Sequence, residues 1–198
     1  MGELVGIVNY GIAGNIFSIQ KALVKAGGNT FVINEPSDFN RADKIVIPGV
    51  GSFKDAMDEL KKNKMIEPLT SYSKPILGIC LGMQIMSHIG FEYGKTKGLG
   101  LIHAEVKDML VDGVVPHMGF NKISIINNNK VLDGLDGESF YFMHSFEMVS
   151  YTNASALTNY CGHKFVSAVH CGNVYGVQFH PEKSREAGIS VFSNFLKI

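Results

Sequence analysis

The sequence predicts a single α/β domain, built on a mixed, mostly parallel sheet flanked by helices and extended by antiparallel strands. In the first half, short apolar runs alternate with segments of helical periodicity, which is typical of parallel strands joined by crossover helices. From about Gly98 onward, short β-like runs follow one another without helical patterns between them. With 198 residues, 45% of them hydrophobic, the chain can bury one good core, so we expect one domain over residues 1–198.

Four apolar runs in the first half are predicted strands: residues 4–8, 31–33, 44–47 and 75–79. Three helices are predicted beside them. The first has apolar positions from Ile16 to Ala26 and stops at Gly27-Gly28. Ser52 is the expected N-cap of the second, and the third is an apolar helix over residues 81–89. This order of elements predicts right-handed crossovers and a parallel sheet.

Six short β-like runs follow in the second half: residues 101–106, 122–126, 140–142, 146–149, 164–169 and 174–179. Their connections are too short for crossover helices, so we expect antiparallel pairing. Asn127-Asn128-Asn129 and Asp133-Gly134 predict exposed turns. A closing C-terminal helix is predicted from the apolar residues Ile189, Phe192, Phe195 and Leu196.

Charge and composition exclude several classes of function. Eighteen basic and eighteen acidic residues leave no net charge, whereas a protein that binds nucleic-acid phosphates is expected to carry a basic excess. The same balance, with the high hydrophobic content, excludes intrinsic disorder. No apolar run reaches the ~18 residues of a membrane span, and three cysteines are too few for a disulfide framework. We therefore expect a reduced, cytoplasmic protein.

The sharpest local feature is the segment Gly78-Ile79-Cys80-Leu81-Gly82. A predicted strand runs directly into a predicted helix, with a cysteine at the junction and a glycine two residues to either side, as in a nucleophile elbow. Such a turn is too tight for side chains at the flanking positions, and it places the thiol at a helix N-terminus, where the dipole favours thiolate. The N–H of Leu81 is then free to donate to an oxyanion. A buried structural cysteine at a strand end remains the alternative.

A base is available near the C-terminus, in Val177-Gln178-Phe179-His180-Pro181-Glu182. In an extended segment, residues i and i+2 point to the same side, so Glu182 can orient His180. His180 could then take the Cys80 proton and return it to an amine leaving group. A His-x-Glu pair is weak evidence alone, but an elbow and such a pair together are far more specific.

A third feature is the glycine-rich turn Pro48-Gly49-Val50-Gly51-Ser52-Phe53 between a strand and a helix. It lacks the third glycine and the downstream acid of a dinucleotide site, and it is no P-loop. A loop that offers the N–H of Val50 suits the second donor of an oxyanion hole better.

Together, the elbow, the Pro-Gly-x-Gly loop and the terminal His-Pro-Glu resemble a class I (triad) glutamine amidotransferase. Within that family, further segments resemble the glutaminase subunit of imidazole glycerol phosphate synthases, over essentially the whole chain. These segments are Asn9-Tyr10-Gly11…Gly14-Asn15, residues 48–53, residues 115–121 and residues 141–146. The resemblance implies the class I amidotransferase fold with its flavodoxin-like core.

The resemblance also implies roles for the matching residues. Cys80 would attack the side-chain amide of L-glutamine, with His180 as general base and acid and Glu182 orienting it. The N–H groups of Val50 and Leu81 would form the oxyanion hole. No cofactor and no metal are expected. The substrate's amino-acid end would be held by Gly49, Gly51, Gln84, Ser145 and Phe146.

By the same resemblance, the ammonia would pass to a partner (β/α)8-barrel synthase in a heterodimer, with Asn15, Met118 and Phe120 at the interface. This chain departs from the family near that interface. The family usually has Asp at the position of Asn9 and Trp at that of Phe120, and Ala13 makes the intervening turn one residue longer. A paralogue that serves another synthase, such as one forming an amidino sugar, is therefore an alternative. Others are a stand-alone cysteine hydrolase and a non-catalytic assembly subunit.

The remaining cysteines and histidines have ordinary explanations. Cys161-x-His163 and His170-Cys171 contain zinc-ligand residue types, but neither spacing is a standard motif, and a glycine-containing hairpin explains them. His117 and His144 belong to the family motifs and are predicted to line the interface or the mouth of the site. Met83, Ile85 and Met86 are predicted core residues.

Overall fold

The computed structural model describes residues 3–11, 15–149 and 151–198, and its centre is an eight-stranded mixed sheet. The strand order is β2-β1-β3-β4-β14-β13-β12-β9. Strands β2 to β14 in this order run parallel, and β13, β12 and β9 continue the sheet antiparallel. The predicted mixed sheet is therefore confirmed. The strands are β1 (Leu4–Val8), β2 (Asn29–Ile33), β3 (Lys44–Ile47), β4 (Ile76–Ile79), β9 (Ser124–Ile125), β12 (Ala154–Tyr160), β13 (His163–Cys171) and β14 (Val174–Val177).

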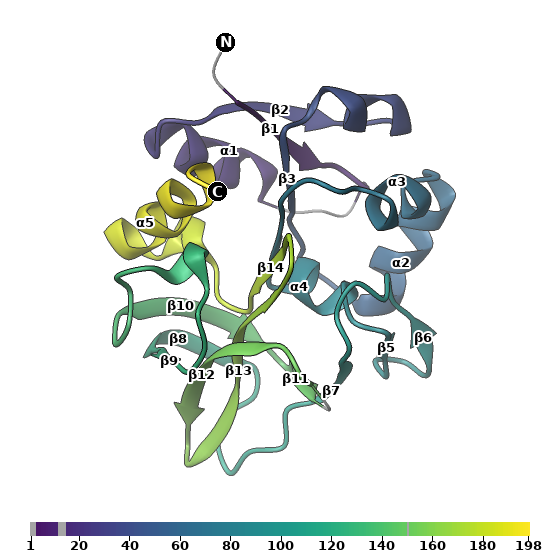
Figure 1. Ribbon diagram of the computed structural model, residues 1–198. Helices are drawn as coiled ribbons and strands as arrows, with labels where there is room; N and C mark the ends of the chain where they lie inside the picture. Colours follow the sequence, from purple (N-terminus) through teal and green to yellow (C-terminus); the bar gives the residue numbers. More distant parts are fainter. Residues whose placement is uncertain (1–2, 12–14, 150) are drawn as a thin grey trace.

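Helices cover both faces of the parallel strands, of which β3, β4 and β14 are buried throughout their length, whereas the edge strand β2 is mostly only partly buried. Figure 1 shows α1 (Ile16–Lys25) and α5 (Arg185–Leu196) on one side, and α2 (Phe53–Lys62), α3 (Ile66–Thr70) and α4 (Leu81–Ile85) on the other. Side chains alternate between two hydrophobic clusters along each strand: Val46 and Leu77 join the α1–α5 side, whereas Ile45 and Ile76 join the α2 side. Burial on both faces explains the continuous apolar runs of these strands. No helix within the described ranges is long and apolar enough to cross a membrane.

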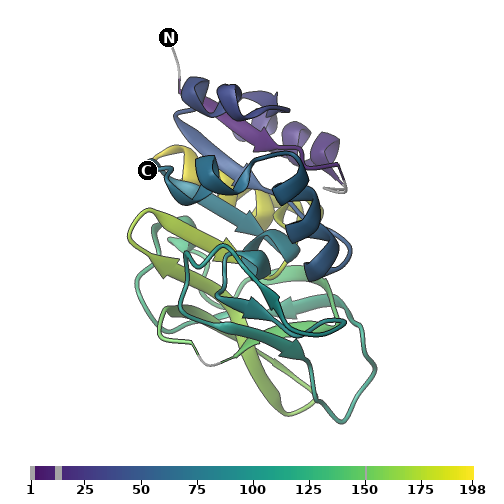
Figure 2. The ribbon, with the colours of Figure 1, turned by 90° about the vertical axis from the view of Figure 1, so that its right-hand side faces the viewer.

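Two smaller sheets lie at the opposite end of the molecule from β1 and β2 (Figure 2). In one, β8 (His117–Lys122) pairs antiparallel with β10 (Ser139–His144). The other has the order β11-β7-β5-β6. Its strands are β11 (Phe146–Val149), β7 (Glu105–Asp108), β5 (Ile89–Gly90) and β6 (Thr96–Lys97). Three 3-10 turns complete the described elements: η1 (Pro36–Arg41), η2 (Lys130–Leu132) and η3 (Pro181–Lys183).

The helix predicted over residues 81–89 is shorter than expected, because α4 ends at Ile85. A loop from farther along the chain provides the hydrogen bonds that would have continued the helix. The N–H of Leu99 donates to the carbonyl of Ile85 at 2.8 Å, and the N–H of Gly100 to that of Ser87 at 2.9 Å. The chain then turns into β5, so Ile89 lies in a strand. Met83, Ile85 and Met86 are fully buried, as predicted.

Other differences concern the second half. The strand predicted over residues 101–106 begins only at Glu105, and β14 ends at Val177 rather than at residue 179. β14 pairs antiparallel with β13, as expected, but it runs parallel to β4 on its other side, which was not expected. Asn129 is not an exposed turn residue: it is buried and its side chain accepts a hydrogen bond from the N–H of Val131.

Candidate active site

Cys80 lies between β4 and α4 with φ 52° and ψ −112°, a strained conformation for a non-glycine residue. The glycines beside it are required by close packing. A Cβ on Gly82 would lie 1.9 Å from the carbonyl oxygen of Ile47, and one on Gly78 would lie 2.8 Å from the backbone of Gly82. The steric reason predicted for both glycines is therefore confirmed.

The segment with His180 is joined to the elbow by the sheet. β14 lies beside β4, with Val177 opposite Ile79, and the N–H of Cys80 donates to the carbonyl of Val177 at 2.8 Å. His180 follows three residues later. The sheet thus brings together two segments that are far apart in the sequence.

His180 and Glu182 form a buried pair, with 2.8 Å between His180 Nδ1 and Glu182 Oε1. Their side chains are only 2% and 0% exposed. The pairing agrees with the prediction, but its geometric basis differs, because Glu182 lies in the 3-10 turn η3 rather than in an extended segment. The tight turn, which starts at Pro181, brings the carboxylate back to the imidazole.

Two residues that sequence reasoning missed hold this turn in place. The carbonyl of Tyr141 in β10 accepts the N–H of His180 at 2.8 Å. The hydroxyl of Ser184 donates to the carbonyl of His180 at 2.6 Å and accepts the N–H of Tyr141 at 2.9 Å. A serine just before a predicted helix was the available signal for Ser184.

The electrostatics of the site favour a protonated His180. Burial lowers its pKa, but the negative charge of Cys80 and the hydrogen-bonded carboxylate of Glu182 outweigh burial and raise the pKa to about 10. The side-chain amide of Asn15 donates to the same Glu182 oxygen that faces His180. Asn15, which we predicted at a partner interface, therefore also contacts the carboxylate.

Cys80 and His180 open into a cavity of about 190 Å³, which is small enough to suit a single small metabolite. Two predicted site residues do not line it: Glu182 lies behind His180, and Gly49 packs against Gly82 instead. Glu92, Pro116 and Met143 line the cavity but were not predicted as site residues, and His144, predicted at the interface or the mouth of the site, lines it as well. The other lining residues are Val50, Gly51, Leu81, Gln84, Ser145 and Phe146, all of which were predicted.

Two residues that line this cavity, Val50 and Leu81, have backbone N–H groups that are free to donate. Leu81 is the first residue of α4, so its N–H has no acceptor within the helix. Within the described parts of the chain, the N–H of Val50 donates to no other residue. The loop of Val50 is held by Tyr10, a buried residue whose hydroxyl donates to the carbonyl of Pro48 at 2.7 Å. Burial, together with the nearby Cys80, raises the pKa of Tyr10.

Gln84 has a second set of contacts besides the cavity. Its side-chain amide donates to the carbonyl of Phe146 and to Oε1 of Gln178, each at 3.0 Å. Gln178 in turn donates to Cys80 Sγ at 3.6 Å. Sequence reasoning placed Gln178 within a strand and missed its contact with the thiol.

The family model for class-I glutamine amidotransferases matches residues 9–198. The chain belongs to the class I glutamine amidotransferase family. It is 40% identical to imidazole glycerol phosphate synthase subunit HisH 1 of Campylobacter jejuni and 40% identical to subunit HisH of Wolinella succinogenes. Each comparison covers 98% of this chain and 100% of the relative, so the chain falls in the HisH branch of the family.

Solved structures show the same fold. The structure of PurLQS from Thermotoga maritima superimposes with a TM-score of 0.77 at 19% identity, covering 100% of this chain and 99% of that chain. A crystal structure of a glutamine amidotransferase gives a TM-score of 0.76 at 15% identity, covering 98% and 99% of the two chains. The predicted α/β fold of a class I amidotransferase is thereby confirmed.

Two of the predicted interface residues lie in β8, which pairs with the cavity-lining strand β10, and the third, Asn15, lies at the start of α1. Met118 and Phe120 in β8 are 58% and 46% exposed, and Asn15 is half-buried. His144 lines the cavity, whereas His117 is buried and does not line it. For both residues, a place at the partner interface stays a prediction. Ala13 and Gly14, part of the proposed longer turn, lie outside the described residues.

The amidotransferase does not bring the cysteine–histidine pairs together. Cys161 and His163 lie at the β12–β13 turn, whereas His170 and Cys171 end β13 at the other end of that strand. His163 instead contacts the buried carboxylate of Glu147 at 2.8 Å. Among the described residues, no group of three or more His, Cys, Asp or Glu side chains is arranged to hold a metal ion.

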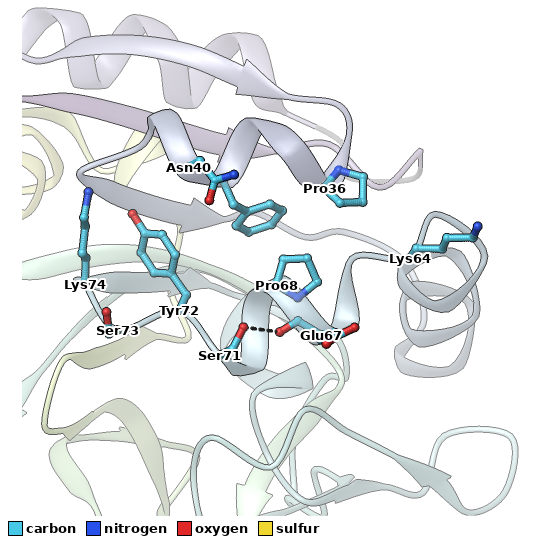
Figure 3. Close-up of a pocket in the computed structure, with 10 residues that line it drawn as sticks. Pro36, Asn40, Lys64, Glu67, Pro68, Ser71, Tyr72, Ser73 and Lys74 are labelled. Atoms are coloured by element: carbon cyan, nitrogen blue, oxygen red, sulfur yellow. Dashed lines mark hydrogen bonds between the residues drawn. The ribbon is translucent and has the colours of Figure 1, made fainter.

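A larger cavity of about 650 Å³ lies between η1, α3 and residues 71–74. Figure 3 shows Lys64 and Lys74 at opposite ends of it, with Pro68 and Tyr72 between them. Both Tyr72 and Lys74 donate to the carbonyl of Ala42, at 2.9 and 2.8 Å. No predicted site residue lines this cavity, so size alone does not locate the active site.

The amidotransferase should lose stability in acid through His144. Burial lowers the pKa of His144 from 6.5 to about 4, so its contribution is present above pH 6.5 and is lost as the pH falls toward 4. His180 acts in the opposite sense: its folded pKa is raised above the unfolded value of 6.5, so its stabilisation is fully present below pH 6.5 and decreases as the pH rises. His144→Asn retains His180, so this contribution cancels when the two proteins are compared. We therefore expect the free energy of unfolding, measured with urea between pH 4 and 7, to fall more steeply with decreasing pH in the wild type than in His144→Asn. The difference between the two proteins should change by up to about 3 kcal/mol over this range. If the free energy of unfolding changed with pH by the same amount in both proteins, this expectation would be contradicted.

Proposed function

We propose that this chain is a glutaminase subunit that hydrolyses L-glutamine to glutamate and ammonia through Cys80, His180 and Glu182. The Cys80 thiolate attacks the side-chain amide carbon, and the negative charge moves to the amide oxygen. The N–H groups of Val50 and Leu81 stabilise this oxyanion. His180 then donates its proton to the leaving nitrogen, and the C–N bond breaks to give ammonia and a glutamyl thioester.

Water completes the reaction. His180, now neutral, takes a proton from a water molecule, which attacks the thioester carbon through a second oxyanion. The C–S bond breaks, glutamate leaves, and the thiolate and the protonated imidazole are restored. Glu182 stays ionised and keeps Nδ1 of His180 protonated and in place. The observation that carries this proposal is one small cavity shared by Cys80 and His180, with Glu182 buried behind the imidazole.

The cavity also offers groups that suit the amino-acid end of glutamine. Glu92 lines the cavity, and one of its carboxylate oxygens accepts a hydrogen bond from the N–H of Phe53 at 2.7 Å. Its carboxylate can pair with the substrate's ammonium group. Gly51 and the backbone of Ser145 and Phe146 lie around the same space and can contact the rest of that end. A hydrolase without selectivity for glutamine would not need this arrangement.

We further propose that the ammonia passes to a (β/α)8-barrel synthase bound over the cavity as the other half of a heterodimer. The relatives in Campylobacter and Wolinella are subunits of imidazole glycerol phosphate synthase, which makes that synthase the favoured partner. Exposed apolar side chains lie next to Pro116, which lines the cavity, as an interface requires. They are Val114, Val115, Met118 and Phe120. Neutral net charge argues against nucleic acid as a partner.

The test is ammonia release with and without the partner. We expect the isolated chain to release little ammonia from glutamine, and its cognate synthase with the acceptor substrate to raise the rate by about 100-fold or more, since completing an oxyanion hole contributes that much. Glutamate dehydrogenase coupling measures the glutamate formed. Activation by an amidino-sugar synthase instead would favour the paralogue. Full activity without any partner would overturn the subunit proposal, and no activity in any complex would overturn the glutaminase proposal.

A further inference from the structure

We propose that His117 is a positioning residue, which acts through His144 to hold the Phe146 carbonyl and, with it, the Ser145–Phe146 backbone of the glutamine site. This inference rests on the proposed function, because it assigns these backbone atoms to the substrate cavity. His117 itself does not line that cavity. Its influence on glutamine would therefore be transmitted entirely by hydrogen bonds.

The first link is between His144 and Phe146. Nδ1 of His144 lies 2.8 Å from the carbonyl oxygen of Phe146. A carbonyl can only accept a hydrogen bond, so Nδ1 carries the proton. In a neutral imidazole the other nitrogen, Nε2, is then an acceptor. His144 thus needs a donor at Nε2 to keep this tautomer.

His117 is that donor. Its Nδ1 lies 3.3 Å from Nε2 of His144, so the Nδ1–H of His117 donates to His144. Both rings are buried, His117 at 2% exposure and His144 at 6%. Burial lowers the pKa of both, that of His144 to about 4, so both remain neutral at physiological pH. The two hydrogen bonds therefore point in one direction, from His117 to His144 to Phe146.

The ring of His117 is held in the orientation that this donation requires. It stacks on Tyr160 with 4.0 Å between ring centroids and on Phe142 with 5.0 Å. The strands also fix the pair, because His117 lies directly opposite His144 in the β8–β10 register. Neither ring can turn away without disrupting this packing.

We call the two hydrogen bonds from His117 to His144 and from His144 to Phe146 the histidine relay. The Phe146 carbonyl connects this relay to the reacting thiol. It also accepts the side-chain amide of Gln84, whose amide donates to Gln178, which in turn donates to Cys80 Sγ. The neighbouring Ser145 carbonyl accepts the N–H of Met109 at 2.9 Å. Two donors on one carbonyl fix the plane of the peptide beside the substrate, which is how an outer residue can set substrate affinity.

Two substitutions at the same position separate hydrogen bonding from packing. His117→Phe keeps the aromatic stack but removes the donor and leaves Nε2 of His144 unpaired in the interior. His117→Asn keeps a donor at the place of Nδ1 but loses the ring. We expect His117→Phe to raise KM for glutamine about tenfold with a smaller change in kcat, and His117→Asn to restore most of the affinity.

The measurements use the complex with the partner synthase, with glutamate release as the readout and complex formation checked separately. His170→Phe is the matched control, because His170 also stacks on a tyrosine, Tyr175 at 4.5 Å, but does not line the cavity. An unchanged KM in His117→Phe would overturn the inference. The inference would also be overturned if KM for glutamine rose in His117→Asn but not in His117→Phe, because loss of ring packing rather than loss of the hydrogen bond would then explain the change.

Nitrogen-15 NMR of histidine-labelled wild-type chain tests the relay without substitution and without activity. We expect His117 and His144 both to show the neutral form with the proton on Nδ1. The proton on Nε2 of either ring would overturn the inference even if the variants failed to fold. An inactive wild-type complex with the expected tautomers would instead count against the glutaminase proposal and leave the relay in place.

Discussion

Replacement of Cys80 by alanine should reduce glutamine turnover by about 10⁴-fold or more, because the variant has no nucleophile to form the thioester. The change removes one sulfur atom from a buried side chain. Among the described residues, the thiol makes only two long hydrogen bonds, one from Gln178 at 3.6 Å and one to the carbonyl of Met143 at 3.8 Å. The protein should therefore still fold and bind its partner. Glutamate release by the complex measures the loss.

The other two cysteines supply matched controls. Cys161 and Cys171 are exposed and unpaired by disulfides, and neither lines the cavity. Cys161→Ala and Cys171→Ala should both leave turnover unchanged. Mass spectrometry of the wild-type complex quenched during turnover should find a glutamyl adduct on Cys80. Substantial activity in Cys80→Ala would show that the nucleophile has been assigned to the wrong residue.

Gly82→Ala should destabilise the protein by about 3 kcal/mol or more, since the added Cβ would lie 1.9 Å from the carbonyl oxygen of Ile47. The obstacle is backbone, and β3 cannot move away because β1 and β4 pair with it on both sides. Urea unfolding followed by circular dichroism measures the change. Activity should fall with it, because the same strain displaces Cys80.

Gly134→Ala distinguishes close packing from backbone conformation. Gly134 has φ +73° and open space around its Cα, so an alanine there should cost only about 1 kcal/mol from the left-handed conformation. If the two alanine variants were equally stable, close packing of α4 against β3 could not be the reason for Gly82.

The candidate site could be predicted from the sequence where its constraints are local. The glycines around Cys80 are needed within one turn of chain, and Glu182 reaches His180 across one proline. The contacts of Gln178 and Tyr10 could not be predicted in this way. They depend on β4 lying beside β14 and on the loop after β3 passing over Tyr10, and each involves segments distant in the sequence.

The fold shows the same limit. The central parallel strands β3 and β4 were predicted because both of their faces are buried and their sequences are almost continuously apolar. The parallel pairing of β14 was not predicted, because it depends on which strand lies next to it in the sheet. β12 was missed because polar residues interrupt its pattern, although Ser155 and Thr158 are buried in the structure. Likewise, α4 ends early because of the loop at Leu99 and Gly100, which periodicity within residues 81–89 cannot reveal.

Because β4 and β14 are neighbours in the main sheet, the residues proposed for catalysis are positioned separately from those proposed for binding the partner synthase. The spacing of Cys80 from His180 is set by one hydrogen-bonded ladder in the main sheet. The chain between those strands supplies Ser145 and Phe146 at the cavity and Met118 and Phe120 on the surface. On the proposed docking surface, substitutions at Met118 and Phe120 are expected to change which synthase binds while Cys80 and His180 keep their places. The partner synthase could therefore change during evolution while the proposed catalytic residues stay the same.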